Sequence, residues 1–421
     1  MNAYGYNIAF FTNTYRPFIG GVAMSVDLFQ RTLTELGNQV IVYAPEYDLA
    51  AEDGQDVRRL PAIRHFNHTD FSLPLPVSFK PIVDFSAQAF DIVHVHHPFL
   101  LGEMGLRIAR QHRLPLVFTY HTQYERYTHY VPVSQETAQR TILRHALEFC
   151  NLCDLVIAPT TDMEQMLRER GVETRIEVLP TGIELERYDR RRDPGVLRRE
   201  LGLAEDTPVL VHVGRLALEK NLIFLLTACL RVLAAEPRAH LVIAGDGPIR
   251  EQLETMAAQA GEAGERVHLL GARTGEELID VYRAGDLFVF SSKTETQGMV
   301  VAEAMAAGVP AIALEASGLG DVVRDDVNGR LLAGDIDEEG FARAVVAALA
   351  DRERREAWRE GALRTARKMD MVLLAQKLHG HYASLKLLPN RQLKQELMSF
   401  GLLRNFFETV WEDLENWFTR I

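Results

Sequence analysis

Arg215 and Lys220 lie five residues apart in the segment GRLALEKN, which begins with Gly214 directly after the apolar run Val209–Val213. The guanidinium of Arg215 offers a planar fork of N–H donors, and the ammonium of Lys220 is a compact point charge. Two such cations in one loop suit two neighbouring phosphates. A solvated surface pair is the alternative, but the position directly after a strand favours ligand binding.

Glu295 and Glu303 flank Gly298 in the segment SSKTETQGMVVAEAMAAGVP. If much of this segment is helical, a rise of about 1.5 Å per residue places the carboxylates roughly 8 to 12 Å apart, whereas a retaining glycosidase needs about 5 to 5.5 Å. The pair therefore fits two hydroxyl acceptors at opposite ends of an extended ligand better than a hydrolytic acid and nucleophile. Backbone N–H groups of Gly298, Met299 and Val300, at the expected helix start, favour negative charge between them. Two solvated glutamates on a helix face would not explain the small residues around them.

Two glycine-bearing turns follow other expected strands. Gly20 and Gly21 end TNTYRPFIGG and precede a helix, where the backbone can approach an anionic ligand closely; a flexible turn is the alternative. Gly245 and Gly247 begin GDGP, but Arg250 stands where a dinucleotide fingerprint has its third glycine. Hydride transfer is therefore disfavoured, and a tight strand-to-helix turn near the ligand is expected.

Two other groups of residues imitate metal sites. His94 and His96 share one face of an expected strand next to His97, but no carboxylate lies nearby in the sequence, which favours a satisfied cluster at a strand end. Asp335 and Asp337 imitate an Asp-x-Asp metal motif but precede a helical pattern, which is typical of an N-cap. The sequence therefore predicts no metal site.

The order of elements predicts an α/β fold, because short β-branched runs alternate with amphipathic helical stretches. The expected strands are 7–11, 39–43, 91–96, 114–120, 155–158 and 176–179, followed by 209–213, 240–244, 267–270, 287–290 and 311–314. We therefore predict two doubly wound, Rossmann-like domains facing a central cleft. Their expected bounds are 1–185 for the first domain, 186–206 for a linker, 207–370 for the second domain, and 371–421 for C-terminal helices returning to the first domain.

The composition is that of a soluble globular protein, with 421 residues of which 47% are hydrophobic and 25% charged. A formal net charge of −12 argues against general affinity for nucleic acid. Three cysteines cannot form a disulfide framework, and Cys150 and Cys153 are expected to be buried thiols rather than a zinc or redox pair. No secretory leader and no apolar run of about 18 to 20 residues is evident, so we predict a cytoplasmic protein or one on the inner face of a membrane.

Taken in order, the motifs TNTYRPFIGGV, HVHHPF, YHT, VGRLALEKN, AGDGP and the two glutamates separated by seven residues resemble glycosyltransferase family 4. The resemblance covers nearly the whole chain. It implies the GT-B fold and the transfer of a hexose from a nucleotide diphosphate sugar with retention of configuration. It also implies that neither a metal nor another cofactor takes part.

Carried over position by position, the resemblance implies a donor site in the second domain. Arg215 and Lys220 would neutralise the diphosphate, Glu303 would hold the ribose hydroxyls and Glu295 the sugar hydroxyls. The loop containing Arg273 matches the place where the base is held, but it does not indicate which base. With the turn glycines and the helix start, the predicted donor-binding residues are Gly20, Gly21, Gly214, Arg215, Lys220, Gly245, Gly247, Arg273, Glu295, Gly298, Met299, Val300 and Glu303.

The predicted catalytic set adds a histidine from the first domain. His121 of the YHT motif matches the family histidine that faces the sugar across the cleft, and it joins Arg215, Lys220 and Glu295. No Asp or Glu is placed as a nucleophile, whereas cations surround the leaving diphosphate. We therefore expect front-side displacement, in which a phosphate oxygen helps to deprotonate the acceptor.

The acceptor side is predicted from the segment YHTQYERYTHYVP, which looks like the corresponding segment of bacterial diacylglycerol glucosyltransferases. Its Tyr124, Tyr127 and Tyr130, together with Tyr15, would offer an amphipathic surface to a lipid, unless the tyrosines pack in the core. This favours UDP-glucose as the donor and a lipid such as diacylglycerol as the acceptor.

Two further segments are candidates for contact with a membrane or a partner. Arg107, Arg110, His112 and Arg113 fall within two helical turns and face either anionic headgroups or solvent. The tail 391–421 has the pattern of an amphipathic helix with nearly balanced charges. Packing on the first domain or on a second copy of the chain is therefore favoured over membrane docking.

Three other functions stay open at this point. Within the same chemistry, the acceptor would be a soluble molecule or a growing polysaccharide. A sugar-nucleotide epimerase would need acids and bases at the sugar carbon rather than an acceptor groove. A non-catalytic binding module is disfavoured because the predicted catalytic set is complete.

Overall fold

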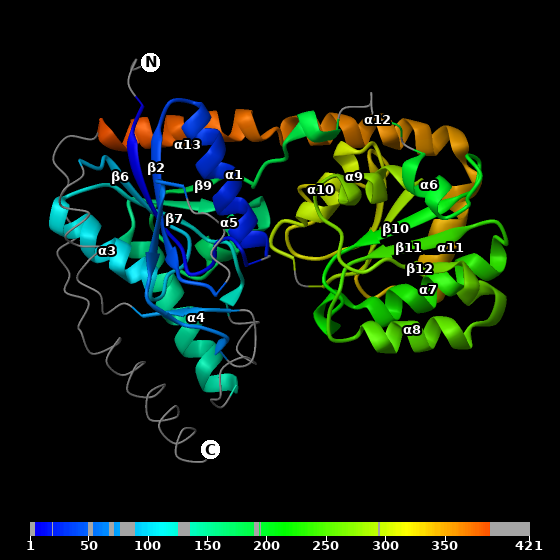
Figure 1. Ribbon diagram of the computed structural model, residues 1–421. Helices are drawn as coiled ribbons and strands as arrows, with labels where there is room; N and C mark the ends of the chain where they lie inside the picture. Colours follow the sequence, from blue (N-terminus) through cyan, green and yellow to red (C-terminus); the bar gives the residue numbers. More distant parts are fainter. Residues whose placement is uncertain are drawn as a thin grey trace, which may run out of the picture. The chain divides into compact units, whose positions relative to one another are not determined.

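The computed structural model describes residues 5–18, 20–48, 54–66, 71–75, 89–124, 135–188, 193, 195–293 and 295–387 (Figure 1). The chain divides into two compact units. Unit 1 comprises residues 1–159, 164–179 and 375–421, and unit 2 comprises residues 160–163 and 180–374. Each unit contains its own parallel sheet, as expected for alternating strands and helices.

Unit 1 contains a seven-stranded sheet in the order β3-β2-β1-β6-β7-β8-β9. Its strands are β1 (Asn7–Phe11), β2 (Gln39–Pro45), β3 (Val57–Leu60), β6 (Ile92–Val95), β7 (Leu116–Thr119), β8 (Leu155–Ala158) and β9 (Ile176–Val178). Strands β4 (Ala62–Ile63) and β5 (Leu73–Pro74) form a separate antiparallel pair. The unit also includes α1 (Gly21–Glu35), α3 (Leu101–His112), α4 (Gln135–Leu152), and most of α5 (Thr161–Glu169) and α13 (Met371–Lys386).

Unit 2 contains a six-stranded parallel sheet in the order β12-β11-β10-β13-β14-β15. Its strands are β10 (Val209–Val213), β11 (His240–Ala244), β12 (Val267–Leu269), β13 (Leu287–Phe290), β14 (Ala311–Leu314) and β15 (Gly329–Leu332). Its α-helices are α6 (Val196–Glu200), α7 (Leu222–Ala235), α8 (Arg250–Gln259), α9 (Gly275–Ala284), α10 (Met299–Ala306), α11 (Glu338–Ala350) and α12 (Arg352–Lys368). Three 3-10 helices complete it: η3 (Leu185–Tyr188), η4 (Leu218–Lys220) and η5 (Gly261–Arg266).

The strand order explains where a ligand is expected in each sheet. The order reverses between β1 and β6 in unit 1, and between β10 and β13 in unit 2. The loops that follow these neighbouring strands diverge at the carboxyl edge, which is where open α/β sheets bind ligands. Polar residues after these four strands are therefore well placed to share a site within their own unit.

The core of unit 2 consists of two apolar clusters. Val209, Val211 and Val213 of β10 enter one cluster, whereas Leu210 enters the other, because successive side chains of a strand point to opposite faces. A strand buried on both faces reads as a continuous apolar run, which is the pattern that β10 shows in the sequence. Burying one such side chain contributes about 1.5 to 3 kcal/mol.

All eleven expected strands are present, with ends shifted by at most two residues. Strands β3 and β15 were not expected, because VRRL and GRLL interrupt the apolar run with arginine. Both lie at a sheet edge, where burial is incomplete and a strand tolerates charge. Within the expected linker 186–206, η3 and α6 belong to unit 2, and Leu197 of α6 is buried in its core.

Two smaller expectations, on the cysteines and on Asp337, also have structural counterparts. Cys150 and Cys153 are buried free thiols, as predicted. Asp337 is the N-cap of α11, and its carboxylate accepts a hydrogen bond of 2.7 Å from the backbone N–H of Gly340. Among the described residues, no helix combines the length and the apolar composition needed to cross a membrane.

Candidate functional site

The turn after β10 is built by close backbone packing against the turn after β11. The N–H of Gly214 donates to the carbonyl of Ala244, and the N–H of Leu216 donates to that of Asp246. Gly245 has φ of +148°, and a Cβ there would lie 1.8 Å from the carbonyl oxygen of Gly214. Only glycine fits such a position, so this predicted donor-binding glycine shapes the loop that carries Arg215.

Lys220 and Glu295 form an ion pair in unit 2, with Nζ and Oε1 2.6 Å apart. Lys220 ends η4 after β10, and Glu295 follows β13, the neighbouring strand at the point of reversal. The hydroxyl of Ser291 donates to the carbonyls of Lys220 and Asn221, at 3.0 and 3.1 Å, and thereby ties the η4 loop to the end of β13. The two predicted groups thus meet within one unit.

The remaining cations of the predicted donor site differ in exposure. The Arg215 side chain is exposed in the loop between β10 and η4. Arg273, after β12, is half-buried, and its guanidinium lies 3.3 Å from the Glu277 carboxylate and 4.0 Å from that of Glu200. Gly271 at the start of this loop has φ of +74°, and its carbonyl accepts from the N–H of Gly245. The turns after β10, β11 and β12 are therefore hydrogen-bonded in series.

Helix α10 begins at Met299 with Gly298 as its N-cap, as predicted. Gly298 has φ of +71°, and a Cβ there would lie 2.4 Å from the side chain of Leu319, so this turn requires glycine. The first N–H groups of a helix lack partners within the helix. The N–H groups of Met299 and Val300, in the first turn, therefore give this end of the helix its affinity for negative charge.

Glu303 on α10 accepts a hydrogen bond of 2.6 Å from the hydroxyl of Tyr282 on α9. Burial raises the pKa of Glu303, and the hydrogen bond from Tyr282 lowers it in part. The Tyr282 ring is fully buried, so its hydroxyl holds one carboxylate oxygen in a fixed place. The sequence analysis did not identify Tyr282, because an aromatic residue on an amphipathic helix is indistinguishable from an ordinary core residue.

The glycines after β1 lie at the start of α1 in unit 1. Gly20 is the N-cap and Gly21 the first residue of the helix. A Cβ on Gly20 would lie 2.8 Å from the ring of Phe18, whereas nothing lies within 4 Å of one on Gly21. The backbone at Gly21 is therefore open to close approach.

The histidines of unit 1 form a connected network after β6 and β7. His94 and His96 stack with ring centroids 4.4 Å apart, and His96 Nδ1 lies 3.0 Å from His121 Nε2. His94 contacts the hydroxyls of Thr119 and Tyr382, both at 2.7 Å. The rings form a cluster at the strand ends, but the predicted satisfaction is incomplete, because His96 Nε2 has no hydrogen-bond partner among the described residues. The described residues include no group of three or more His, Cys, Asp or Glu disposed to hold a metal ion.

Burial keeps these imidazoles neutral near pH 7. It lowers the pKa of His94 and of His97 to about 3. It lowers the pKa of His96 and of His121 well below the ordinary value, and the neighbouring histidines add to the effect. The network therefore offers neutral donors and acceptors rather than positive charge.

The predicted acceptor-side tyrosines have unequal surroundings. Tyr15 is fully buried, with the guanidinium groups of Arg16 and Arg59 over its ring, and burial raises its pKa to about 12. Tyr124 packs edge-on against Phe99 and Tyr120, with each pair of ring centroids 5.4 Å apart. The described part of the predicted acceptor surface is thus packed inside unit 1. Tyr127, Tyr130 and the tail 391–421 lie outside the described residues.

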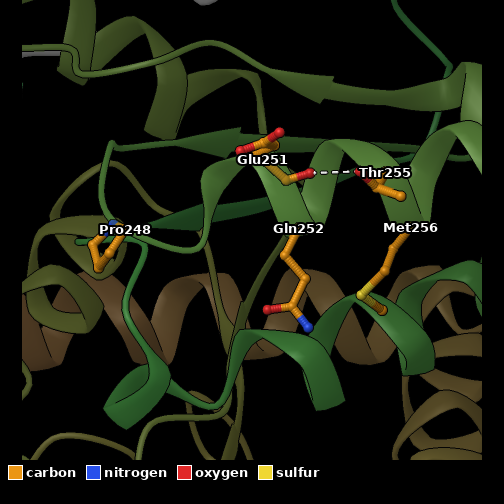
Figure 2. Close-up of a pocket in the computed structure, with 5 residues that line it drawn as sticks. All are labelled: Pro248, Glu251, Gln252, Thr255 and Met256. Carbon is orange, nitrogen blue, oxygen red and sulfur yellow. Dashed lines mark hydrogen bonds between the residues drawn. The ribbon is translucent and has the colours of Figure 1, made fainter.

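A surface hollow of about 400 Å³ lies beside α8 in unit 2 (Figure 2). Its lining consists of Pro248, Glu251, Gln252, Thr255 and Met256. None of these residues belongs to the predicted site, and the one charged side chain, Glu251, would repel a diphosphate. The hollow is therefore not a candidate for the donor.

Two family models match the chain. "Glycosyltransferase Family 4" matches residues 19–187, and "Glycosyl transferases group 1" matches residues 195–365. Each model covers most of one of the two sheets. The two predicted halves of the site therefore fall under different models.

Curated relatives and solved structures agree with these matches. An alpha-monoglucosyldiacylglycerol synthase from Streptococcus pneumoniae is 31% identical over 347 residues, which are 81% of this chain and 78% of the relative. A GDP-mannose-dependent alpha-mannosyltransferase from Mycobacterium tuberculosis is 30% identical over 390 residues, covering 91% of this chain and 97% of the relative. The crystal structure of Anabaena HepE in complex with UDP-glucose has a TM-score of 0.69 and 22% identity, and the match covers 90% of this chain and 100% of that chain.

Proposed function

We propose that this chain, which belongs to glycosyltransferase family 4, moves a hexose from a nucleotide diphosphate sugar to a lipid acceptor such as diacylglycerol. The two sheets are those of a GT-B glycosyltransferase. UDP-glucose is the favoured donor and diacylglycerol the favoured acceptor, because the Streptococcus relative is a monoglucosyldiacylglycerol synthase. The observation that carries the proposal is the meeting of Lys220 and Glu295 at the strand reversal of unit 2.

In the first step, the donor diphosphate replaces the Glu295 carboxylate as the partner of Lys220. Without a donor, the Glu295 carboxylate neutralises this ammonium. A diphosphate carries more negative charge than one carboxylate, so it competes for Lys220 with help from Arg215 and the α10 N-terminus. Glu295 is then released to accept hydrogen bonds from sugar hydroxyls, and diphosphate capture prepares the sugar site.

The nucleoside end is held farther along α10. Glu303 accepts hydrogen bonds from the ribose hydroxyls, because a carboxylate oxygen has lone pairs beyond the one that Tyr282 occupies. Tyr282 keeps the carboxylate in place while the ribose binds. The loop with Arg273 contacts the base.

The transfer itself proceeds on one face of the sugar. The bond between C1 and the phosphate oxygen breaks, and a new bond forms from the acceptor hydroxyl oxygen to C1 on the same face. The hydroxyl proton passes to an oxygen of the leaving diphosphate. Lys220, Arg215 and the first amides of α10 stabilise the charge on that diphosphate, a contribution of several kcal/mol at a preorganised site. Retention follows without a protein nucleophile, and these groups supply the positive charge that a metal would otherwise provide.

His121 contributes from unit 1. A neutral imidazole suits a sugar hydroxyl better than a phosphate, because it brings hydrogen bonding without charge. The lipid acceptor is taken up on the side of unit 1, at the inner face of the membrane.

Incubation of the purified protein with labelled UDP-glucose, UDP-galactose or GDP-mannose, with and without diacylglycerol vesicles, tests the proposal. We expect label in the lipid phase only when UDP-glucose and diacylglycerol are both present, with unchanged yield after chelation of divalent metals. The anomeric proton coupling of the product reports retention. Labelled product without any acceptor would favour an epimerase, and transfer to water-soluble sugars alone would exclude the lipid acceptor.

Mannosyl transfer is the second candidate function. The Mycobacterium relative uses GDP-mannose by name and matches more of this chain than the glucosyl relative does. Product from GDP-mannose and none from UDP-glucose would support this candidate.

A further inference from the structure

The contact between His96 and His121 carries a further inference, which rests on the proposed sugar-facing role of His121. We infer that His96 is a positioning residue that fixes the tautomer of His121, so that His121 presents its Nδ1–H as a donor to a sugar oxygen and does not act as a base. The inference is carried by the pairing of the ring nitrogens and by one nitrogen of His96 that has no partner.

One hydrogen bond joins the two rings. His96 Nδ1 and His121 Nε2 lie 3.0 Å apart, which is hydrogen-bond distance. Burial keeps both rings neutral, so each carries one N–H and one bare nitrogen. Either His96 donates through Nδ1, or His121 donates through Nε2.

The second nitrogen of His96 decides between these arrangements. His96 is 1% exposed, and its Nε2 has no hydrogen-bond partner among the described residues. If His121 donated, His96 would carry its own proton on Nε2, as a buried N–H without an acceptor. Such orphaned N–H groups are rarer than orphaned acceptors, because a buried donor without an acceptor destabilises the fold. His96 therefore holds its proton on Nδ1 and donates to His121.

The consequence falls on His121. Its Nε2 accepts from His96, so its own proton lies on Nδ1. The one bare nitrogen of His121 is occupied, and the ring is left with an N–H that donates to an oxygen. This agrees with a transfer in which the leaving phosphate takes the acceptor proton. His94 holds the ring of His96 in place, because it stacks on that ring and is itself hydrogen-bonded to Thr119 and Tyr382.

Long-range proton–nitrogen NMR of protein labelled with ¹⁵N-histidine tests the tautomer directly. Two histidines serve as internal references. The backbone N–H of Asn13 donates to His97 Nδ1, so His97 carries its proton on Nε2. His212 Nδ1 donates to the carbonyl of Val289, so His212 carries its proton on Nδ1.

We expect the spectrum of His121 to match that of His212. The signal is assigned by its loss in His121→Gln. A spectrum like that of His97 would overturn the inference. This readout does not depend on catalysis, so it separates failure of the inference from failure of the proposed function: an active enzyme with the other tautomer overturns only the inference.

Two substitutions of His96 test whether the tautomer matters for transfer. His96→Asn keeps an N–H near the position of Nδ1, whereas His96→Leu removes both nitrogens. We expect His96→Asn to retain kcat/KM for the sugar nucleotide within about threefold and His96→Leu to lose about tenfold or more, with the Kd for UDP unchanged in both. UDP lacks the sugar, so its binding should not respond.

Unfolding experiments exclude a merely structural role. His96→Leu removes a buried unpaired nitrogen, so we expect its Tm to equal or exceed that of the unchanged protein. Equal activity losses in both variants together with a lower Tm would overturn the inference. His240→Leu is the matched control, because His240 Nδ1 also lies 3.0 Å from a histidine nitrogen, that of His268, but in unit 2 and away from the proposed site. Its kcat/KM should stay unchanged.

Discussion

The two units place different side chains at the carboxyl edges of sheets that have a similar topology. In unit 1, the loop after β6, beside the strand reversal, and the loop after the next strand, β7, bring together two neutral rings, the buried His96 and the half-buried His121. In unit 2, the loops after β10 and β13, on the two sides of the reversal, bring Lys220 and Glu295 together as an ion pair. Under the proposed function, the neutral rings of unit 1 suit sugar hydroxyls, and the cation of unit 2 suits the diphosphate.

Replacing Lys220 by Ala should have the largest effect on activity. The variant loses the charge that we propose stabilises the leaving diphosphate, so we expect kcat/KM to fall about 10²- to 10³-fold, or about 3 to 4 kcal/mol. Steady-state kinetics and a thermal scan measure the two consequences, and the Tm should change little because the pair is partly exposed. Lys368→Ala, at an exposed position of unit 2, is the control. Unchanged kinetics would remove the diphosphate role from this loop.

Acid should destabilise unit 1 more than unit 2. The pKa of His94 is lowered to about 3 and that of His96 well below normal, so the unfolded chain binds more protons once the pH falls below about 6.5. Each of these histidines then costs about 1.4 kcal/mol of stability per pH unit. In unit 2, His212 is the one histidine whose pKa is lowered comparably, to about 4, among the described residues.

Hydrogen exchange, corrected for intrinsic rates, measures this difference unit by unit. Protection in the strands of unit 1 should decrease more than that in unit 2 between about pH 7 and pH 5. Equal losses in the two units would show that their acid sensitivity is the same.

Glu295→Gln should change UDP affinity and turnover of the sugar nucleotide in opposite directions. Without the competing carboxylate, Lys220 is available, so we expect UDP to bind on the order of threefold to tenfold more tightly. Turnover of the sugar nucleotide should fall, because the hydroxyl acceptor is lost. Calorimetry with UDP and steady-state kinetics measure the two effects.

Glu254→Gln is the matched control for this variant, since the Glu254 carboxylate pairs with the Arg250 guanidinium at 2.8 Å on an exposed surface of the same unit. If UDP affinity stays unchanged in Glu295→Gln, or changes equally in the control, the diphosphate does not compete with Glu295 for Lys220.

Glu303→Gln should have opposite effects on stability and on function. Burial raises the pKa of Glu303, so the ionised carboxylate opposes folding increasingly as the pH rises above the ordinary glutamate value. We expect the variant to unfold at a higher Tm at neutral pH and to bind UDP more weakly.

The gain should shrink as the pH falls toward about 4, where the carboxyl is protonated in both states. Calorimetric scans at several pH values measure it. A lower Tm at neutral pH would mean that the hydrogen bond from Tyr282 outweighs the burial of charge.

Much of the fold was predictable because it is encoded by neighbours along the chain. The strands were recognisable as apolar runs, since parallel strands are buried on both faces. The start of α10 was recognisable from Gly298, and the loop after β10 from Gly214, because a sharp turn limits the residue type locally. The edge strands β3 and β15 were not predicted, since half-buried arginines interrupt their apolar pattern.

The sequence by itself determined which side chains stand after which strands, and the family to which they belong. The tertiary structure alone decided their partners. Lys220 meets Glu295 across 75 residues of chain, Glu303 meets Tyr282 across 21, and His94 meets Tyr382 across 288. Such pairs leave no periodic trace, because a hydrogen bond depends on the distance between two atoms in space and not on their separation along the chain.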